Sequence, residues 1–293
     1  MNSKYLIKDF CQETTPEDVY QLMQNKHRSS GKKIKREFFH KKYSRSYYND
    51  KPLVSKLIYF NNSAVAHVGA FPMTAVVNQK NHPILQIGDI ITHSDHTGKG
   101  LFSELMKAII ADAKEKNYTF LFVVPNASAL PIFINKFKWQ KTQENVVFSL
   151  KIKTVFLNKV FNKIKLIPLY EKLFDSVNKK YLMNRNIENN PYRSNNTQDS
   201  IFKDSGFYNY KTYAKNYLYK FNYGNVWFKL DDGILVGEIC LHKLKSIEKL
   251  MLELSSFAKK RGIHNLKIHQ SKKNSQYDYF NNGNYSKSES LHD

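Results

Sequence analysis

The segment Thr97-Gly98-Lys99-Gly100-Leu101-Phe102 lies between a strand-like run and a long amphipathic segment. The run before it, residues 83–93, is rich in isoleucine and ends in a polar loop. After it, apolar residues recur at helical spacing as far as Lys116, and a nearly continuous apolar run follows at 118–124. Such a run is typical of a buried parallel strand. The order strand, glycine loop, helix, strand therefore predicts an α/β fold.

Two glycines at a strand-to-helix junction suit a phosphate site. Backbone N–H groups and the positive end of the helix dipole face such a loop, and together they bind a pyrophosphate. Gly98 and Gly100 would let the chain approach that ligand closely. An isolated Gly-x-Gly more often marks only a structural turn, so the interpretation depends on the flanking strand and helix and on Asn126 after the second strand.

The loop resembles the Gln/Arg-x-x-Gly-x-Gly/Ala signature of the GNAT superfamily, which wraps the pyrophosphate of coenzyme A. The resemblance covers the element order of residues 1–152, with motif support from about residue 83 to 139. It implies a mixed central sheet flanked by helices and an acyl-coenzyme A co-substrate. It also implies the residues that hold this co-substrate: Thr97, Gly98, Lys99, Gly100, Leu101 and Phe102 at the pyrophosphate, Asn126 at the pantetheine, and the backbone amides of Ile90, Ile91 and Thr92 at the thioester carbonyl.

The sequence departs from the GNAT pattern in three places. Thr97 replaces the usual Gln or Arg, and Phe102 replaces a small residue, but neither change removes a backbone amide. The tyrosine that often serves as general acid would fall near Ile134 and is absent. The thiolate leaving group then needs no protein acid, or takes its proton from water.

Amide formation requires an uncharged amine, so a base or a water chain must remove a proton from the acceptor ammonium. The resemblance implies a carboxylate on the strand before the loop, and Asp89 is the first candidate. His93 is the second, because imidazole titrates near neutral pH. A period of two would place Asp89, Ile91 and His93 on one face of the strand. The alternative is that Asp89 only pairs with a neighbouring strand or a lysine.

The second half of the chain repeats the order of the first. Strand-like runs at 217–221, 226–230 and 234–241 precede a helix at about 246–261 and a strand at 265–269. Sliding Leu250 onto Leu105 also superposes several further residues: Met251 on Met106, Ala258 on Ala113, Lys259 on Lys114 and Leu266 on Leu121.

The second copy lacks the glycine loop and is not expected to bind coenzyme. Leu241-His242-Lys243-Leu244-Lys245 stands in its place. The predicted domains are therefore a GNAT domain at 1–152, a helical connector and loop at 153–206, and a degenerate GNAT-like domain at 207–293 that completes the acceptor cleft.

The charge balance bears on the partners. Lysine and arginine total 46 against 25 acidic residues, a net charge of +21. Such a field attracts polyanions such as nucleic acid, anionic lipid or phosphorylated small molecules, and it disfavours a cationic acceptor. A compositional bias toward lysine explains the excess equally well, and charge alone does not predict nucleic-acid binding.

Cysteine usage and hydropathy bound the compartment. Only Cys11 and Cys240 occur, so neither a disulfide framework nor a metal-ligand cluster is expected. The first residues hold no apolar signal core, and no run reaches the length of a membrane span, so we expect a cytoplasmic protein. The basic, amphipathic segment 153–183 is interpreted as a connector packing across the domains, or as a helix with weak peripheral membrane association.

The acceptor is expected to be a nucleotide-linked amino sugar. The doubled arrangement is similar to that of two-domain GNAT sugar N-acyltransferases, which work in surface polysaccharide synthesis. A lysine-rich cleft would attract the diphosphate of such an acceptor, and its base could stack on an aromatic ring. Residues expected on the acceptor side are Arg28, Lys32, Arg36 and Tyr43, each of which could equally be a solvated surface residue.

Three other functions fit parts of the sequence. The first is acetylation of a peptide, polyamine or antibiotic amine, and the second is a FemABX-like aminoacyl transfer from tRNA, which does not rely on a coenzyme A loop. The third is a basic, non-enzymatic module that binds a membrane surface.

Overall fold

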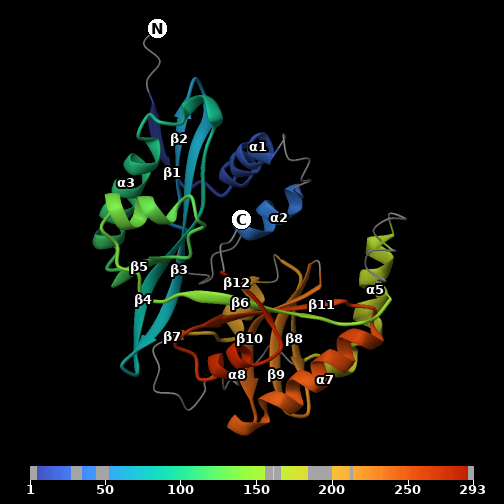
Figure 1. The fold of residues 1–293 in the computed structure, drawn as a ribbon. Coiled ribbons are helices and arrows are strands. Elements are labelled where there is room, and N and C mark those ends of the chain that lie inside the picture. The colour runs from blue at the N-terminus through green and yellow to red at the C-terminus, as the bar shows by residue number, and fades with distance from the viewer. Residues whose placement is uncertain are drawn as a thin grey trace. The chain divides into compact units, whose positions relative to one another are not determined.

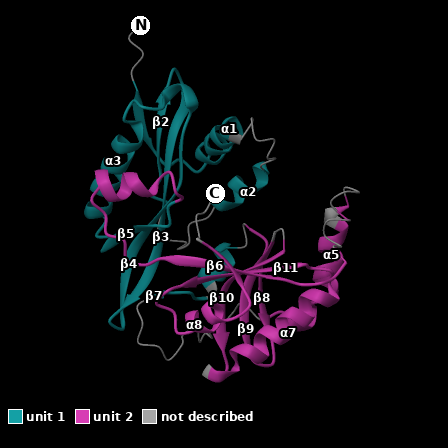
Figure 2. Ribbon diagram, viewed as in Figure 1, with its two compact units in different colours: residues 1–125, 195–213 teal, residues 126–194, 214–293 magenta. Residues whose placement is uncertain are grey.

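The computed structural model describes residues 5–27, 35–43, 53–155, 161, 166–183, 200–211, 214–231 and 233–289. The chain divides into two compact units, shown in two colours in Figure 2. Unit 1 comprises residues 1–125 and 195–213, and unit 2 comprises residues 126–194 and 214–293. Each unit is built on its own six-stranded sheet.

The sheet of unit 1 is mixed. Its strand order is β1-β2-β3-β4-β5, and β7 pairs with β3. Every neighbouring pair is antiparallel except β4 and β5, which run parallel. The strands are β1 (Leu6–Asp9), β2 (Lys56–Phe60), β3 (Ser63–Val77), β4 (Lys80–Thr92), β5 (Phe120–Val123) and β7 (Ser200–Ile201).

Helices cover both faces of this sheet, with α3 on one side and α1 on the other (Figure 1). The helices of unit 1 are α1 (Thr15–His27), α2 (Arg36–Tyr43), α3 (Leu101–Glu115) and α6 (Ser205–Tyr210). The apolar spacing seen in the sequence explains α3, because Leu101, Leu105 and Ile109 form one buried stripe. The buried Lys56 ammonium lies 2.7 Å from a carboxylate oxygen of Asp112, and this ion pair ties α3 to β2.

The sheet of unit 2 has the order β12-β6-β11-β10-β9-β8, with β10 and β11 parallel. Its strands are β6 (Asn145–Lys151), β8 (Asn216–Lys220), β9 (Gly224–Asp231), β10 (Gly233–Leu241), β11 (Asn265–Ser271) and β12 (Ser286–Glu289). Its helices are α5 (Ile167–Val177), α7 (Ile247–Lys260) and α8 (Tyr277–Asn282), together with a π-helical turn at Ile132–Lys136.

The unit boundary differs from the one drawn at residue 152. Strand β6 lies within the range 1–152 expected for the first domain, but it pairs with β11 of unit 2 over seven residues, from Asn145↔Ser271 to Lys151↔Asn265. Conversely, β7 comes from the segment expected to be connector and loop, and α6 spans the expected boundary between residues 206 and 207, yet both belong to unit 1. The alternation of side chains within a strand predicts which face is buried but not which strand lies beside it. The local sequence therefore does not show that β6 pairs in unit 2 and β7 in unit 1.

The two sheets share the strand-helix-strand order of a GNAT fold. Helix α7 follows β10 as α3 follows β4, and each helix leads into a strand parallel to the one before it. The superposed residues also agree in burial: Leu105, Leu250 and Met106 are fully buried, and Met251 is 3% exposed. The fold is therefore α/β, with two sheets of GNAT-like order.

No helix in the described ranges is both long and apolar enough to cross a membrane.

Candidate active site

A β-bulge interrupts β4 beside β3. The register shifts between His67 and Gly69 on β3, which face Ile91 and Gly88 on β4, so β4 carries one residue more than its partner here. Asp89 lies in the bulge with φ +47°, a left-handed conformation that aspartate tolerates better than most residues. The Asp89 carboxylate meets Tyr43, whose ring packs on His67, and His67 is the cross-strand partner of Ile91, so the side chains of Asp89 and Ile91 lie on one face of β4.

A buried histidine holds the backbone of the bulge. The Nδ1 of His67 lies 2.8 Å from the carbonyl oxygen of Asp89. A carbonyl oxygen only accepts, so Nδ1 carries the proton and donates it. His67 is fully buried, and within the described part of the chain its Nε2 has no hydrogen-bond partner.

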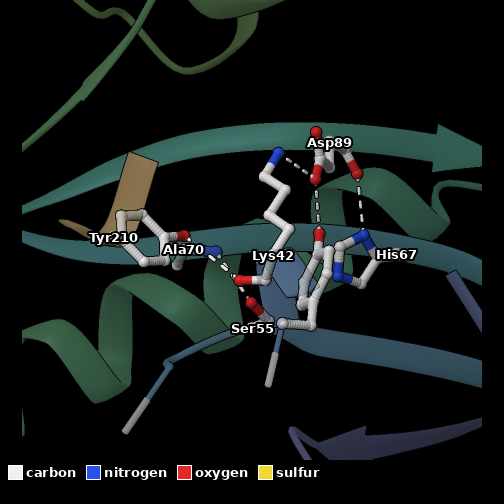
Figure 3. A network of polar contacts seen from close by, with 7 residues as sticks. Lys42, Ser55, His67, Ala70, Asp89 and Tyr210 are labelled. Carbon is white, nitrogen blue, oxygen red and sulfur yellow. Dashed lines mark hydrogen bonds and ion pairs between the residues drawn. The ribbon is translucent and has the colours of Figure 1, made fainter. Parts of the chain in front are cut away.

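The carboxylate of Asp89 is held by two neighbouring residues of α2 (Figure 3). The Lys42 ammonium donates to its Oδ2 at 2.5 Å, and the Tyr43 hydroxyl donates to the same oxygen at 2.7 Å. Only 13% of the Lys42 side chain and 18% of the Asp89 side chain are exposed, so this ion pair is largely shielded from water. The Lys42 ammonium also lies 4.7 Å from the centre of the Phe71 ring. The structure thus shows the lysine pairing that the sequence left open.

Burial and charge act in opposite directions on Asp89. Desolvation raises the pKa of its carboxyl, but the charge of Lys42 and the hydrogen bonds from Lys42 and Tyr43 hold the net pKa below its usual value. Asp89 is therefore ionised at neutral pH.

Burial dominates at His67. Loss of solvation lowers the pKa of its imidazole to about 4, and the nearby Asp89 only partly opposes this effect. His67 is therefore neutral at neutral pH, which agrees with the tautomer fixed by its hydrogen bond.

We expect the free energy of unfolding to fall as pH decreases from about 6.5 to about 4. Over this range the unfolded histidine binds a proton that the folded, buried His67 does not, so acid favours unfolding. The difference between the ordinary value of 6.5 and a folded value of about 4 corresponds to about 3 kcal/mol at the acid end. Denaturant titrations of His67→Gln should show a flatter pH profile. His82→Gln, at a partly exposed position on β4, is the matched control, and an equally steep profile in His67→Gln would contradict the assignment.

The glycine loop has the backbone that its sequence predicts. Gly98 and Gly100 have φ +74° and +79°, a region that glycine enters without steric cost. Gly100 is the N-cap of α3 and supplies no side-chain cap, so the helix begins with backbone groups only. A Cβ at either glycine would meet no protein atom within 4 Å. The need for glycine here comes from backbone conformation and from space left on the outer side of the loop, not from packing inside the protein.

The edge of β4 opens just before this loop. Pairing with β5 ends at Ile87↔Val123, whereas β4 continues to Thr92. The amide of His93 donates to Val65 O on the β3 side at 2.8 Å. Because neighbouring amides along a strand point to opposite edges, the Thr92 amide points to the side from which β5 has separated. A ligand carbonyl could bind there.

His93 contacts the short turn that precedes the glycine loop. Its Nδ1 accepts a 3.4 Å hydrogen bond from the Asp95 amide and thereby caps the short 3₁₀ turn Ser94–His96. In the same turn, Thr97 donates its hydroxyl to Ser94 O at 2.8 Å. These contacts shape the start of the glycine loop.

Asn126 caps the turn that follows β5. Its Oδ1 accepts hydrogen bonds of 2.9 Å from the Ser128 hydroxyl and from the Ala129 amide. Its expected contact with pantetheine stays a prediction.

The structure describes two of the four residues expected on the acceptor side, Arg36 and Tyr43. Tyr43 is 1% exposed, so it cannot stack on a nucleobase, and its hydroxyl serves Asp89 instead. Arg36 is exposed and its Nε lies 2.6 Å from a Glu17 carboxylate oxygen. Arg28 and Lys32 lie outside the described residues.

Lys42 and His67 were missed by the sequence reasoning. Lys42 is one lysine among many, and His67 stands in an ordinary strand pattern. The adjacent pair Lys42-Tyr43 was the available signal, but only the tertiary structure brings it to Asp89.

The family comparison agrees with this geometry. Residues 12–141 match the family model described as "Acetyltransferase (GNAT) domain". The match includes the β4 bulge, the glycine loop and Asn126. No curated protein matches the chain.

Several solved structures share the fold. A conserved protein of unknown function from Enterococcus faecalis V583, described as a probable N-acyltransferase, aligns with a TM-score of 0.63 and 13% identity over 98% of this chain and 70% of that one. A GCN5-related N-acetyltransferase from Kribbella flavida aligns with a TM-score of 0.55 and 12% identity over 93% and 65%. Eis1 from Mycobacterium abscessus gives 0.52 and 12% over 90% and 65%. At these identities the likeness shows the fold alone, and this chain spans about two thirds of the length of those proteins.

The domain that carries the site defines the class of this protein, which is an acyl-CoA-dependent N-acyltransferase. More particularly, residues 12–141 form a GNAT acetyltransferase domain, which uses acyl-coenzyme A and an amine acceptor.

Proposed function

We propose that this protein transfers an acyl group, acetyl or a short hydroxyacyl, to the amino group of a nucleotide-linked amino sugar used in surface polysaccharide synthesis. The observation that carries the proposal is the second sheet, which repeats the strand-helix-strand order of the first without the glycine loop. A second copy that does not hold coenzyme is available to bind the acceptor.

The start of α7 supports this division of roles. Ser246, at the N-cap of α7, is 9% exposed and donates its hydroxyl to Tyr223 O at 3.1 Å and to Lys243 O at 2.6 Å. A one-turn 3₁₀ helix, Leu244–Ser246, leads into α7 where the glycine loop leads into α3. The chain thus enters α7 through a 3₁₀ turn and a serine N-cap, whereas it enters α3 through a glycine N-cap.

The residues around the glycine loop fit an acyl-coenzyme A. The amides of 97–102 would bind the pyrophosphate at the N-terminus of α3. Of the three amides expected at the thioester carbonyl, that of Thr92 is proposed to polarise it, because the Ile91 amide points to the β3 edge by the same alternation; a role for Ile90 stays a prediction. The thioester supplies the activated acyl group. Asn126 is proposed for the pantetheine.

Asp89 is proposed as the group that receives the ammonium proton of the acceptor, directly or through a water chain. Its carboxylate is ionised and shielded, so it is always in the accepting form at neutral pH. The lowered pKa weakens it as a base. His93 is the second candidate. With isoleucine at position 134, the thiolate product is proposed to take its proton from water.

The Michaelis constant for the acceptor should rise with ionic strength. The diphosphate of the acceptor would be attracted by the lysine-rich surface, and the screening length falls from about 10 Å at 0.1 M salt to about 3 Å at 1 M. Steady-state kinetics with a nucleotide amino sugar and with a phosphate-free amino sugar would measure the difference. Equal salt dependence for both acceptors would contradict a diphosphate site.

The decisive test is the mass of the product. Full-length protein would be offered acetyl-CoA and longer acyl-CoAs with a panel of nucleotide amino sugars, peptides and polyamines. Acylation of a nucleotide amino sugar supports the proposal. Ready acylation of a peptide or polyamine amine, with no sugar product, would replace it with the alternative amine acetyltransferase, and transfer from charged tRNA without coenzyme A would indicate the FemABX-like reaction.

A further inference from the structure

Helix α5 carries an apolar stripe that faces solvent. Leu169, Leu173 and Val177 are 46%, 49% and 63% exposed, and Leu166 at the N-cap is 44% exposed. At about 100° per residue, these four positions fall within an arc of about 80°. A soluble helix normally turns such a stripe toward a core, so this one lacks a covering surface in the described part of unit 2.

The stripe borders the face by which α5 packs on the core of unit 2. Tyr170 and Phe174 are 7% and 4% exposed and belong to the core of unit 2, where Phe174 lies 5.2 Å from the Tyr217 ring. The core therefore already fixes α5, while about half of each stripe side chain remains exposed to solvent.

The charges on α5 are distributed about the stripe. Its two acidic residues, Glu171 and Asp175, lie on the opposite side of the helix from the stripe, and both pair with Lys215. Lys172 borders the stripe and is exposed, as are Lys179 and Lys180 just beyond the helix. The side that carries the leucines thus presents only positive charge from α5 and the residues that follow it.

The surrounding sequence has the same sign. Residues 151–180 include no arginine and only those two acidic residues, but eight lysines: Lys151, Lys153, Lys159, Lys163, Lys165, Lys172, Lys179 and Lys180. An apolar stripe bordered by lysines matches the boundary between acyl chains and anionic headgroups, where leucines insert and lysines remain in water. A second protein surface would have to supply both an apolar groove and an acidic border.

We propose that α5 docks the protein on an anionic lipid bilayer through Leu166, Leu169, Leu173 and Val177, with Lys172, Lys179 and Lys180 at the headgroups. The proposal is independent of the acceptor. It concerns a surface in unit 2 that holds no residue proposed for coenzyme binding or proton transfer.

Flotation of full-length protein with vesicles tests the proposal. At low salt the protein should float with vesicles of phosphatidylcholine and phosphatidylglycerol, and should not float with phosphatidylcholine alone. The double variant Leu169→Gln/Leu173→Gln should bind the anionic vesicles at least about 10-fold more weakly, because two inserting side chains are lost. Lys172→Glu/Lys179→Glu/Lys180→Glu should also bind weakly, because each lysine near such a surface is worth about 5-fold.

Leu252→Gln is the matched control, because Leu252 on α7 is 67% exposed and lies outside the stripe. It should bind as the wild type does. Unchanged melting temperature and coenzyme A affinity would show that the variants fold. Equal binding by wild type and the Leu169→Gln/Leu173→Gln variant, or no binding by wild type, would overturn the proposal. A wild-type dimer in light scattering that becomes monomeric in that variant would instead assign the stripe to a second copy of the chain.

Discussion

Replacing Gly100 with valine is expected to abolish coenzyme A binding. Gly100 has φ +79°, which a β-branched residue adopts only with strain, and it begins α3, where the pyrophosphate is proposed to bind. Losing two hydrogen bonds to a charged phosphate corresponds to about 100-fold or more in the dissociation constant. Calorimetry with coenzyme A measures it.

Gly262→Val is the matched control. Gly262 also has positive φ, +64°, but it follows α7 in unit 2. Both variants should lower the melting temperature, whereas only Gly100→Val should lose coenzyme. Unchanged affinity in Gly100→Val would remove the loop from the coenzyme site, and a loss in both variants would show that the effect is general destabilisation.

Asp89→Asn should lower kcat by about 100-fold, the usual size of lost general-base assistance. Asparagine tolerates the left-handed conformation at φ +47°, and its carbonyl oxygen can still accept from Tyr43, so the bulge should persist. The variant therefore separates the charge of Asp89 from its backbone role. Equal activity of variant and wild type from pH 6 to 9 would leave His93 or a water chain as the proton acceptor, and His93→Ala should cost less.

A second variant tests the role of the Asp89 carboxylate by replacing Lys42, the residue with which it forms an ion pair. Lys42→Met removes the charge that lowers the pKa of Asp89, so burial would then raise that pKa. If Asp89 receives the proton, the acidic limb of the kcat/KM profile should move to higher pH. A fall in activity with no movement of that limb would indicate that the pair only holds α2 against β4.

The coenzyme loop could be predicted from the sequence because its determinants are local. Two glycines, a strand before them and an amphipathic helix after them are all read within a few residues, and the structure has β4, α3 and β5 in that order. The Asp89 network could not be predicted in the same way. It depends on a one-residue bulge between β3 and β4 and on α2 reaching that bulge, and neither leaves a periodic trace in the sequence.

The prediction of the strands was better than the prediction of their partners. The strand expected at 265–269 corresponds to β11, but its hydrogen bonding to β6, a strand more than 100 residues earlier in the chain, depends on the whole sheet. The short elements β7 and α6 lie in a segment rich in polar residues, where their two strand residues and six helix residues were too few to show a period.

The two units are interleaved along the chain. Strand β6 precedes β7 in the sequence, but β6 pairs with β11 in unit 2, and β7 pairs with β3 in unit 1. During synthesis, β6 would leave the ribosome long before β11 and wait with both of its edges unpaired, since β12 on its other edge is made later still. The contacts that complete both sheets are non-local, which slows folding and exposes strand edges to aggregation. Nascent chains halted before Asn265 should therefore depend on chaperones. Hybrids that exchange one half between related proteins should be insoluble, unless β6 is exchanged together with β11 and β7 together with β3.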